Sequence, residues 1–219
     1  AEGVFQRLEA QTRRRQIKTH TPFDGVPFWA DLRYIAAYRH PIDVHFSFRR
    51  HVENMRAEVL SDLFPPDLSE GFRIFVNGEH RDGASLSSIV DHYRSSLEIE
   101  PAENVLRLHY ADMLQQPEEV FHRIAGHVGI SHPAETMRSL FNASRFENMK
   151  ANAGRFSVAP RTGFWRDDAD FFDSASSQKW QGKLTAEDLD LYNIKMAALL
   201  PPEHRLWLEW GRSGLSRTL

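Results

Sequence analysis

The chain has 219 residues, 41% of them hydrophobic and 26% charged, which fits one globular domain spanning residues 1–219. Its net charge of −3 argues against a general nucleic-acid binder, because such proteins usually carry a basic excess. The absence of cysteine excludes disulfides, thiolate metal sites and cysteine nucleophiles. No apolar run approaches the roughly 20 residues that cross a bilayer, and the N-terminal AEGVFQRLEA lacks the apolar core of a secretory signal. We therefore expect a soluble cytoplasmic protein that neither enters a membrane nor binds nucleic acid.

Three segments are expected to form strands. Gln16–Thr19 is the first, and it ends before His20 and Pro22, where proline favours extended backbone. Leu32–Tyr38 contains an uncharged run that is typical of a parallel strand buried on both faces. Val105–Tyr110 is the third.

Helical spacing dominates the intervening sequence. One helix is expected to have Pro41 in its first turn and Asp43 near the positive end of its dipole. Its apolar stripe consists of Val44, Phe48, Val52, Met55 and Val59. Further helices are expected over residues 5–15, Leu86–Leu97, Val120–Val128 and Pro201–Gly211, and one more starts at a capping box of Thr185 and Asp188. Strands that alternate with helices indicate an α/β fold with a mostly parallel sheet.

Polar residues follow each expected strand. Lys18 and His20 come after the first, Arg39 after the second, and Tyr110 ends the third. Ligands of open α/β sheets bind beyond the carboxyl ends of the strands, so these four side chains are candidates for one site. Each alone has an ordinary explanation, because a histidine after a strand is more often structural and an arginine there often forms a surface salt bridge. Their coincidence at one sheet edge favours a binding site.

Arg39 and Ser47 form a second feature. Ser47 lies eight residues after Arg39, about two turns into the expected helix. Both can reach a phosphate near the helix N-terminus, where the dipole favours an anion. From the spacing alone, an anion site and an incidental serine beside a surface arginine both stay open. The least regular stretch, Gly163–Lys183, has the length of a loop that often carries function.

Four segments occur in an order that resembles a known family. They are IKTHTPFDGVP (Ile17–Pro27), YIAAYRHPIDVHFSF (Tyr34–Phe48), LRLHYADMLQQPEEVFHRIAGHVGI (Leu106–Ile130) and RFENMKAN (Arg145–Asn152). Together they resemble the nucleotide-dependent sulfotransferases of the cytosolic and bacterial type, over about residues 13–200. The resemblance implies a P-loop-NTPase-like three-layer fold with a central, mostly parallel sheet flanked by helices. It also implies transfer of a sulfuryl group from 3′-phosphoadenosine 5′-phosphosulfate to a hydroxyl or amine of a small-molecule acceptor, with 3′-phosphoadenosine 5′-phosphate as product.

The same resemblance assigns roles to individual residues. His20 matches the general base that takes the acceptor proton, and Lys18 matches the lysine that steadies the phosphosulfate. The nucleotide-binding matches are Arg39 and Ser47 for the 3′-phosphate, and Tyr110, Phe146 and Ser144 for the adenine. These residue types suit the chemistry, because sulfuryl transfer needs a proton acceptor and cations that neutralise charge on the leaving group. No metal is required, and no HExxH motif or acidic pair stands at ligand spacing.

Two departures from the family pattern stand out. The family begins with a strand and loop similar to YPKSGTTW that cradles the 5′-phosphosulfate, and nothing before Arg13 resembles it. We expect that the sequence belongs to a longer protein carrying this segment; the alternative is a loss of activity. In FFDSASSQKW, Asp173 and Ala175 stand where the family has an arginine and a glycine for the 3′-phosphate. Ser174 and Lys179 are candidates to replace that contact, and a solvent loop closing over the site is the equal alternative.

The sequence therefore predicts a single-domain α/β sulfotransferase. One alternative is an inactive nucleotide-binding or scaffold homologue, which the missing loop and Asp173 favour. Another is a small-molecule kinase of the same fold, which would need a Walker lysine and a magnesium-binding acidic residue, and neither is visible. The identity of the acceptor and the oligomeric state stay open, and a homodimer is compatible with the sequence.

Overall fold

The computed structural model describes residues 2–57, 60–80, 83–99, 103–156, 163–167, 169–172 and 174–216. In this part of the chain, β1 (Tyr34–Tyr38) and β2 (Val105–His109) form a two-stranded parallel sheet. Tyr34 lies opposite Val105, and Tyr38 lies opposite His109. Two of the three predicted strands are thus confirmed, each within a residue or two of its expected bounds.

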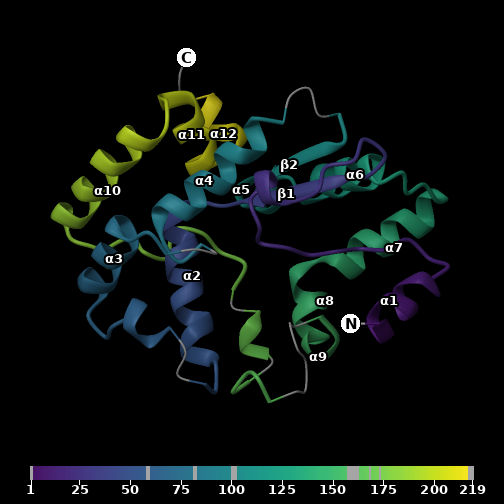
Figure 1. Cartoon of the computed structure of the whole chain (residues 1–219), viewed down its shortest axis with the longest axis horizontal. Coiled ribbons are helices and arrows are strands. Elements are labelled where there is room, and N and C mark those ends of the chain that lie inside the picture. The colour runs from purple at the N-terminus through teal and green to yellow at the C-terminus, as the bar shows by residue number, and fades with distance from the viewer. Residues whose placement is uncertain are drawn as a thin grey trace.

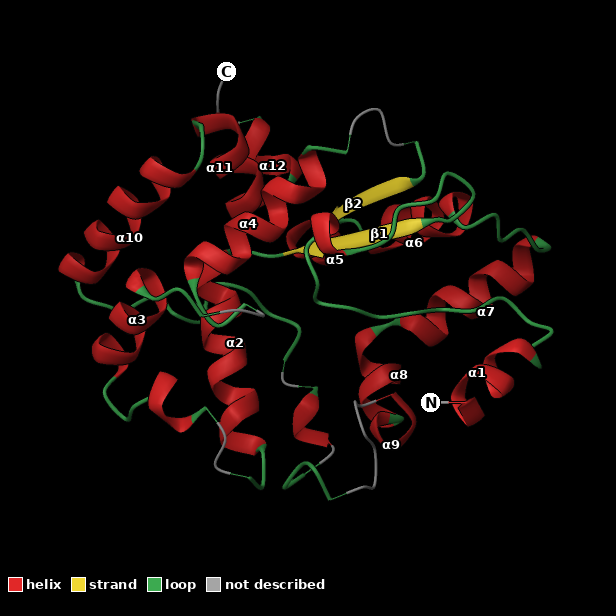
Figure 2. Ribbon diagram, in the orientation of Figure 1, coloured by secondary structure: helices red, strands yellow, loops and turns green. Residues whose placement is uncertain are grey.

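Helices make up most of the remaining structure (Figure 2). Those in the first half of the chain are α1 (Glu2–Glu9), α2 (Pro41–Asn54), α3 (Leu68–Asn77), α4 (Leu86–Leu97), α5 (Tyr110–Gln115) and α6 (Pro117–His127). The others are α7 (Ala134–Ser144), α8 (Phe146–Ala151), α9 (Ala153–Phe156), α10 (Ala186–Leu199), α11 (Pro202–Trp210) and α12 (Arg212–Leu215). Short 3₁₀ turns occur at Phe23–Gly25, Ser61–Leu63 and Ala169–Phe171.

The predicted start of α10 is confirmed in detail. The amide of Asp188 donates to Thr185 Oγ1 at 3.1 Å, and the amide of Thr185 donates to Asp188 Oδ2 at 3.3 Å. Each side chain therefore satisfies a backbone donor that the helix itself leaves open, which is the capping box expected from the sequence.

One face of β1 supports the core. Ala36 and Tyr38 are buried and belong to a cluster with residues of α3, α4, α10 and α11. Tyr38 packs edge-on against Tyr93 of α4 and Trp207 of α11, with ring centres 5.2 and 5.8 Å apart. The opposite face carries Ile35 and Ala37, which are exposed. The expectation of a strand buried on both faces is therefore wrong, because side chains alternate along a strand and the covering helices pack on one face.

The predicted strand at Gln16–Thr19 is also wrong. Residues 11–22 have no regular secondary structure, and Ile17 is 86% exposed. A strand needs a neighbour that pairs with its backbone groups, and within the described residues β1 pairs with β2 alone. The segment instead runs extended beneath the sheet in Figure 1.

Helix α2 ends earlier than its apolar stripe predicts. Met55 leaves the helix and pairs with Trp165 in an antiparallel bridge, while Val59 lies outside the described residues. The amide of Arg166 donates to the Asn54 carbonyl at 2.8 Å, and the amide of Arg56 donates to the Phe164 carbonyl at 3.1 Å. Backbone hydrogen bonds to a distant segment thus replace those of a further helical turn.

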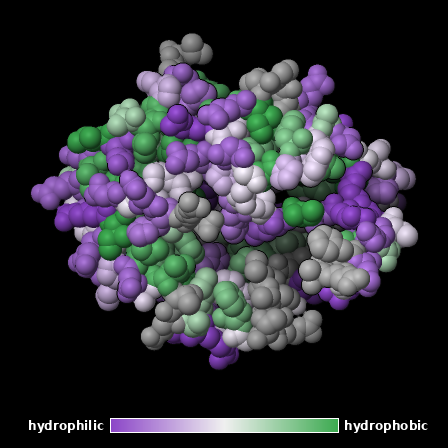
Figure 3. All heavy atoms as spheres, in the orientation of Figure 1, coloured by the Kyte–Doolittle hydropathy of each residue, from purple (hydrophilic) through white to green (hydrophobic). Residues whose placement is uncertain are grey.

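Figure 1 shows two groups of helices on opposite sides of the molecule. Helices α2, α3 and α10 gather on one side of the molecule, and α1, α7 and α8 lie on the other. Polar and apolar residues intermingle over the face drawn in Figure 3. Among the described helices, none has both the length and the apolar composition that a membrane crossing requires.

Candidate functional site

The carboxyl ends of the strands bring Arg39 and Tyr110 together. Because Tyr38 lies opposite His109, the next residue of each strand emerges at the same sheet edge. The guanidinium carbon of Arg39 lies 4.4 Å from the centre of the Tyr110 ring, which is a cation–π contact. Burial raises the pKa of Tyr110, and the charge of Arg39 opposes that rise. Arg39 therefore stacks on a neutral ring and forms no salt bridge within the described residues.

Each strand is joined to its helix by a histidine that caps the helix. The Nδ1 atom of His40 accepts from the Ile42 amide at 3.2 Å, and Nδ1 of His109 accepts from the Ala111 amide at 3.1 Å. The Nε2 atom of His109, which then carries the proton, donates to the Leu208 carbonyl at 3.0 Å. Burial, with a smaller effect of neighbouring charges, lowers the pKa of His40 to about 3. These buried rings are thus neutral, and arginine and lysine supply the positive charge at this edge.

Arg39 and Lys179 form a cation cluster beside the first turn of α2. The Nε atom of Arg39 is buried and has no hydrogen-bond partner. Burial lowers the pKa of Lys179, and the charges of Arg50 and Arg39 lower it further. Like charges that lie close together repel one another, and a bound anion would relieve that repulsion. The arrangement suits a phosphate or sulfate group at the N-terminus of α2.

Ser47 faces the segment that covers α2. It lies one helical turn from both Asp43 and His51, so the three share one face of the helix. Asp43 Oδ1 accepts from the amide of Gln178 at 2.7 Å, and the ring of His51 lies 5.1 Å from that of Phe171. Ser47 is half-buried between these two contacts. It therefore lies on the α2 face that Phe171 and Gln178 contact.

The loop 174–180 closes over the start of α2. Arg39 Nη2 donates to the Ser176 carbonyl at 3.0 Å, and the hydroxyls of Ser174 and Ser176 lie 2.8 Å apart. Ser174 is exposed, Lys179 is half-buried, and Asp173 lies outside the described residues. A cavity of about 190 Å³ lies beside this loop. Its lining includes Arg39, His40, Asp43, His109, Gln178 and Trp210.

Lys18 and His20 are exposed on the extended segment 11–22. Burial lowers the pKa of His51 in the last turn of α2, and Lys18 is among the charges that lower it further. His20 acts in the same direction on His92 of α4, whose pKa is lowered mainly by burial. Lys18 therefore lies near His51 and His20 near His92, and among the described residues neither has a contact with Arg39 or Tyr110.

Phe146 and Ser144 lie at the junction of α7 and α8. The ring of Phe146 is 6.3 Å from Phe172, which is 5.2 Å from Phe171, and Phe171 in turn contacts His51 of α2. This row of rings connects Phe146 to the helix that carries Ser47. The hydroxyl of Ser144 is exposed and donates to the backbone of its own helix at 2.7 Å. The structure thus links Phe146, but not Ser144, to α2.

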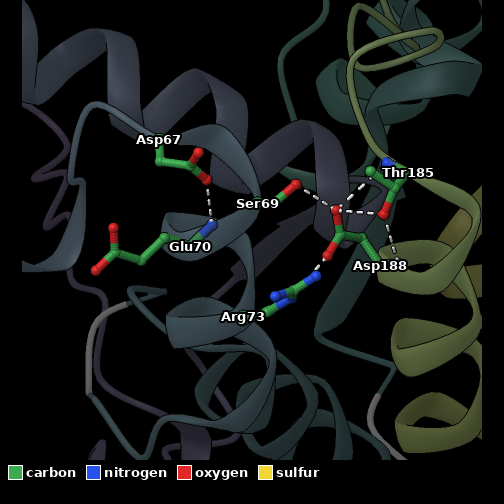
Figure 4. Close-up of polar contacts among 6 residues, drawn as sticks. All are labelled: Asp67, Ser69, Glu70, Arg73, Thr185 and Asp188. Atoms are coloured by element: carbon green, nitrogen blue, oxygen red, sulfur yellow. Dashed lines mark hydrogen bonds and ion pairs between the residues drawn. The ribbon is translucent and has the colours of Figure 1, made fainter.

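A larger, open depression of about 530 Å³ lies elsewhere, along α3. Beside it, Asp188 is fully buried and accepts from Ser69 Oγ at 2.6 Å, Thr185 Oγ1 at 2.9 Å and Arg73 Nε at 3.0 Å (Figure 4). These contacts join α3 to α10, so we assign the cluster to stability. Within the described residues, no group of three or more histidine, aspartate or glutamate side chains is placed to hold a metal ion.

Sequence reasoning missed part of this site. Asp43 was expected only to favour the helix dipole, whereas it anchors a loop 135 residues away. Neither the charge of Arg50 near Lys179 nor the His40 cap of α2 was predicted. The one available signal was the position of Asp43 four residues after Arg39, which places Arg39 just before the helix and Asp43 in its first turn.

Comparisons with known proteins agree on one family. The model of the family described as "Sulfotransferase domain" matches residues 1–196. The chain is 28% identical to the glycolipid sulfotransferase of Mycobacterium bovis (strain BCG / Pasteur 1173P2), covering 97% of this chain and 75% of that protein. It is 25% identical to sulfotransferase 1C2 of Rattus norvegicus, covering 82% of this chain and 59% of that protein.

Solved structures show a similar fold. Mouse sulfotransferase SULT7A1 complexed with PAP superposes with a TM-score of 0.77 at 19% identity, covering 97% of this chain and 76% of that one. Retinol dehydratase in complex with androsterone and inactive cofactor PAP has a TM-score of 0.72 at 22% identity, covering 89% and 56% of the two chains. At these identities the likeness shows the fold, and it confirms the predicted α/β class.

Proposed function

The chain belongs to the sulfotransferase domain family, and on that premise we propose that it uses 3′-phosphoadenosine 5′-phosphosulfate to sulfurylate a hydroxyl or amine of a small-molecule acceptor. The observation that carries the proposal is the cation cluster at the N-terminus of α2, where Arg39 stacks on Tyr110 and keeps a buried, unpartnered Nε atom. Its similarity to the glycolipid sulfotransferase of Mycobacterium bovis supports a small-molecule acceptor.

The residues present fit the 3′-phosphate end of this nucleotide. Arg39 would hold that phosphate through its guanidinium group, with Ser47 donating from the next turns of α2 and Lys179 from the covering loop. A helix N-terminus and a fixed guanidinium both favour an anion, and hydrogen bonds between charged groups are stronger than neutral ones. Tyr110 and Phe146 offer aromatic faces for the adenine, and Ser144, whose hydroxyl donates to its own helix, would be a further adenine contact.

The bound nucleotide would supply the sulfuryl group that is transferred. His20 would accept the proton of the acceptor hydroxyl or amine through its exposed imidazole, since histidine exchanges protons near neutral pH. General-base help of this kind is worth about 10²–10⁴-fold in rate. Lys18, two residues earlier on the same extended segment, would place an ammonium group beside the developing negative charge. No step in this scheme needs a metal ion.

Calorimetry tests the proposal by comparing two arginine variants. The probe is 3′-phosphoadenosine 5′-phosphate, with ATP and magnesium as the competing ligand. We expect metal-independent binding of the probe, and a loss of about 10- to 100-fold in affinity for Arg39→Gln, because a hydrogen bond to a charged group is worth about 1.5–3 kcal/mol.

Arg33→Gln is the matched control. Arg33 precedes β1 at the opposite end of the same strand and is exposed, so its loss changes net charge equally without touching the cluster. If both variants lowered the nucleotide affinity equally, the effect would come from overall charge and not from a site at Arg39. A preference for ATP with magnesium would instead favour a kinase of related fold.

A further inference from the structure

The loop 174–180 is held on α2 from two sides. Arg39 Nη2 donates to the carbonyl of Ser176 at 3.0 Å. The amide of Gln178 donates to Asp43 Oδ1 at 2.7 Å, and the amide of Lys179 donates to the same carboxylate. Arg39, just before α2, and Asp43, in its first turn, thus both bind the backbone of this one loop. This set of hydrogen bonds is called the grip.

Asp43 contributes a buried carboxylate to this grip. It is 2% exposed, and a buried carboxylate is stable only when donors satisfy its oxygens. Burial raises the pKa of Asp43, while the charge of Arg39 and the two loop amides oppose that rise. The carboxylate therefore needs the loop amides as hydrogen-bond donors, and those amides need the carboxylate as their acceptor.

Two residues of the loop have backbone dihedral angles that are unfavourable by themselves. Ala175 has φ of 47° and Gln178 has φ of 64°, both in the left-handed region that residues with a Cβ atom disfavour. Of the non-glycine residues in the described chain, only Leu60 shares this feature. Such strain persists where surrounding contacts fix the conformation. Here Asp43 binds the amide of Gln178 itself, and Arg39 binds the carbonyl of Ser176, the residue after Ala175.

The grip determines where Lys179 lies. Its amide is bound to Asp43, and its side chain lies within electrostatic range of Arg39 and Arg50. Without the anchor, the loop would relax toward unstrained backbone, and repulsion would move Lys179 away from the other cations.

We propose that Asp43 is a positioning residue that never touches the nucleotide but holds loop 174–180 so that Lys179 completes the anion site begun by Arg39. This inference rests on the proposed function for its ligand, though the grip itself exists without one. Asp43 acts through the loop amides, so its loss should alter nucleotide affinity more than the rate of a bound complex.

Hydrogen exchange and calorimetry together test the role of Asp43. In the ligand-free protein, Asp43→Ala should speed amide exchange at Gln178 and Lys179 about tenfold or more, because each loses a charged acceptor. Asp43→Asn, which has the same shape and keeps one acceptor oxygen, should give a smaller increase. Affinity for 3′-phosphoadenosine 5′-phosphate should fall in the same order, by about tenfold for alanine.

Asp112→Asn is the matched control. Asp112 is also buried, also lies in the first turn of a helix, and also accepts a distant backbone amide, that of Arg212 at 3.1 Å. Its replacement should leave exchange in loop 174–180 and nucleotide affinity unchanged.

Three results would overturn the role of Asp43. They are unchanged loop exchange in Asp43→Ala, faster exchange with affinity kept within about twofold, or an equal loss in Asp112→Asn. If the wild-type chain bound no nucleotide, the proposed function would fail, and exchange in the ligand-free protein would still confirm or overturn the grip.

Discussion

Helix α2 carries a histidine whose environment makes stability depend on pH. His45 is 2% exposed and its ring is surrounded by Phe46, Phe64, Phe72 and Phe75, with ring centres 4.7–5.6 Å away. Its Nδ1 atom is buried without a partner. Burial, assisted by the charge of Arg49, lowers its pKa from 6.5 to about 4. The ring is therefore neutral in the folded protein over a range in which the unfolded chain would protonate it.

The sign and size of the effect follow from this difference. Because the folded pKa lies below the unfolded value, the contribution of His45 is fully present above pH 6.5 and is lost as the pH falls toward about 4. Between about pH 7.5 and about pH 5, this one histidine removes about 2 kcal/mol of unfolding free energy. His45→Leu should abolish that part of the loss, while the other buried histidines act equally in both proteins.

Urea unfolding of the wild type and His45→Leu at the two pH values measures the effect. A packing change shifts stability at both values alike, so only the difference between them reports proton binding. His45→Phe, a larger apolar replacement, should show the same reduced difference. If either variant lost as much stability on acidification as the wild type, the burial of a neutral His45 would be wrong.

Three further outcomes follow from the structure. His20→Ala should lower the rate of sulfuryl transfer by about 10²–10⁴-fold and leave nucleotide affinity unchanged in calorimetry; a normal rate would remove His20 as the base. Asp188→Asn should lower the free energy of unfolding by about 2–4 kcal/mol in urea titration, because it breaks a buried group of charge-assisted hydrogen bonds, and a change below about 1 kcal/mol would show that the cluster matters little. Gly211→Ala should lower it by about 2–4 kcal/mol, since the backbone there has φ of 66° and a Cβ would lie 2.7 Å from Asp112 Oδ1; an unaltered unfolding midpoint would contradict this.

The parts of the fold that depend on local pattern were predictable. The strand ending at Tyr38, helix α4 and the Thr185–Asp188 capping box all follow from short-range spacing and are present. The strand at Gln16–Thr19 failed because strand formation depends on a partner, and sequence spacing does not reveal which segments pair. Helices α3 and α7 were not predicted, although both have amphipathic sequences.

The candidate site was also predictable only in part. The meeting of Arg39 and Tyr110 was predictable, because the ends of parallel strands share one sheet edge. The role of Asp43 was not, because its partners lie in a loop without periodicity whose strained backbone at Ala175 and Gln178 gives no signal in the residue types. Long-range contacts of irregular segments depend on the whole fold.

The most direct measurement is whether the chain recognises a 3′-phosphate. Titration with 3′-phosphoadenosine 5′-phosphate and with adenosine 5′-monophosphate differs only by that group. If Arg39, Ser47 and Lys179 form its site, the bisphosphate should bind at least about tenfold more tightly without magnesium, since one charge-assisted contact is worth about 1.5–3 kcal/mol. Equal affinities for the two nucleotides would contradict the assignment of the cation cluster on α2.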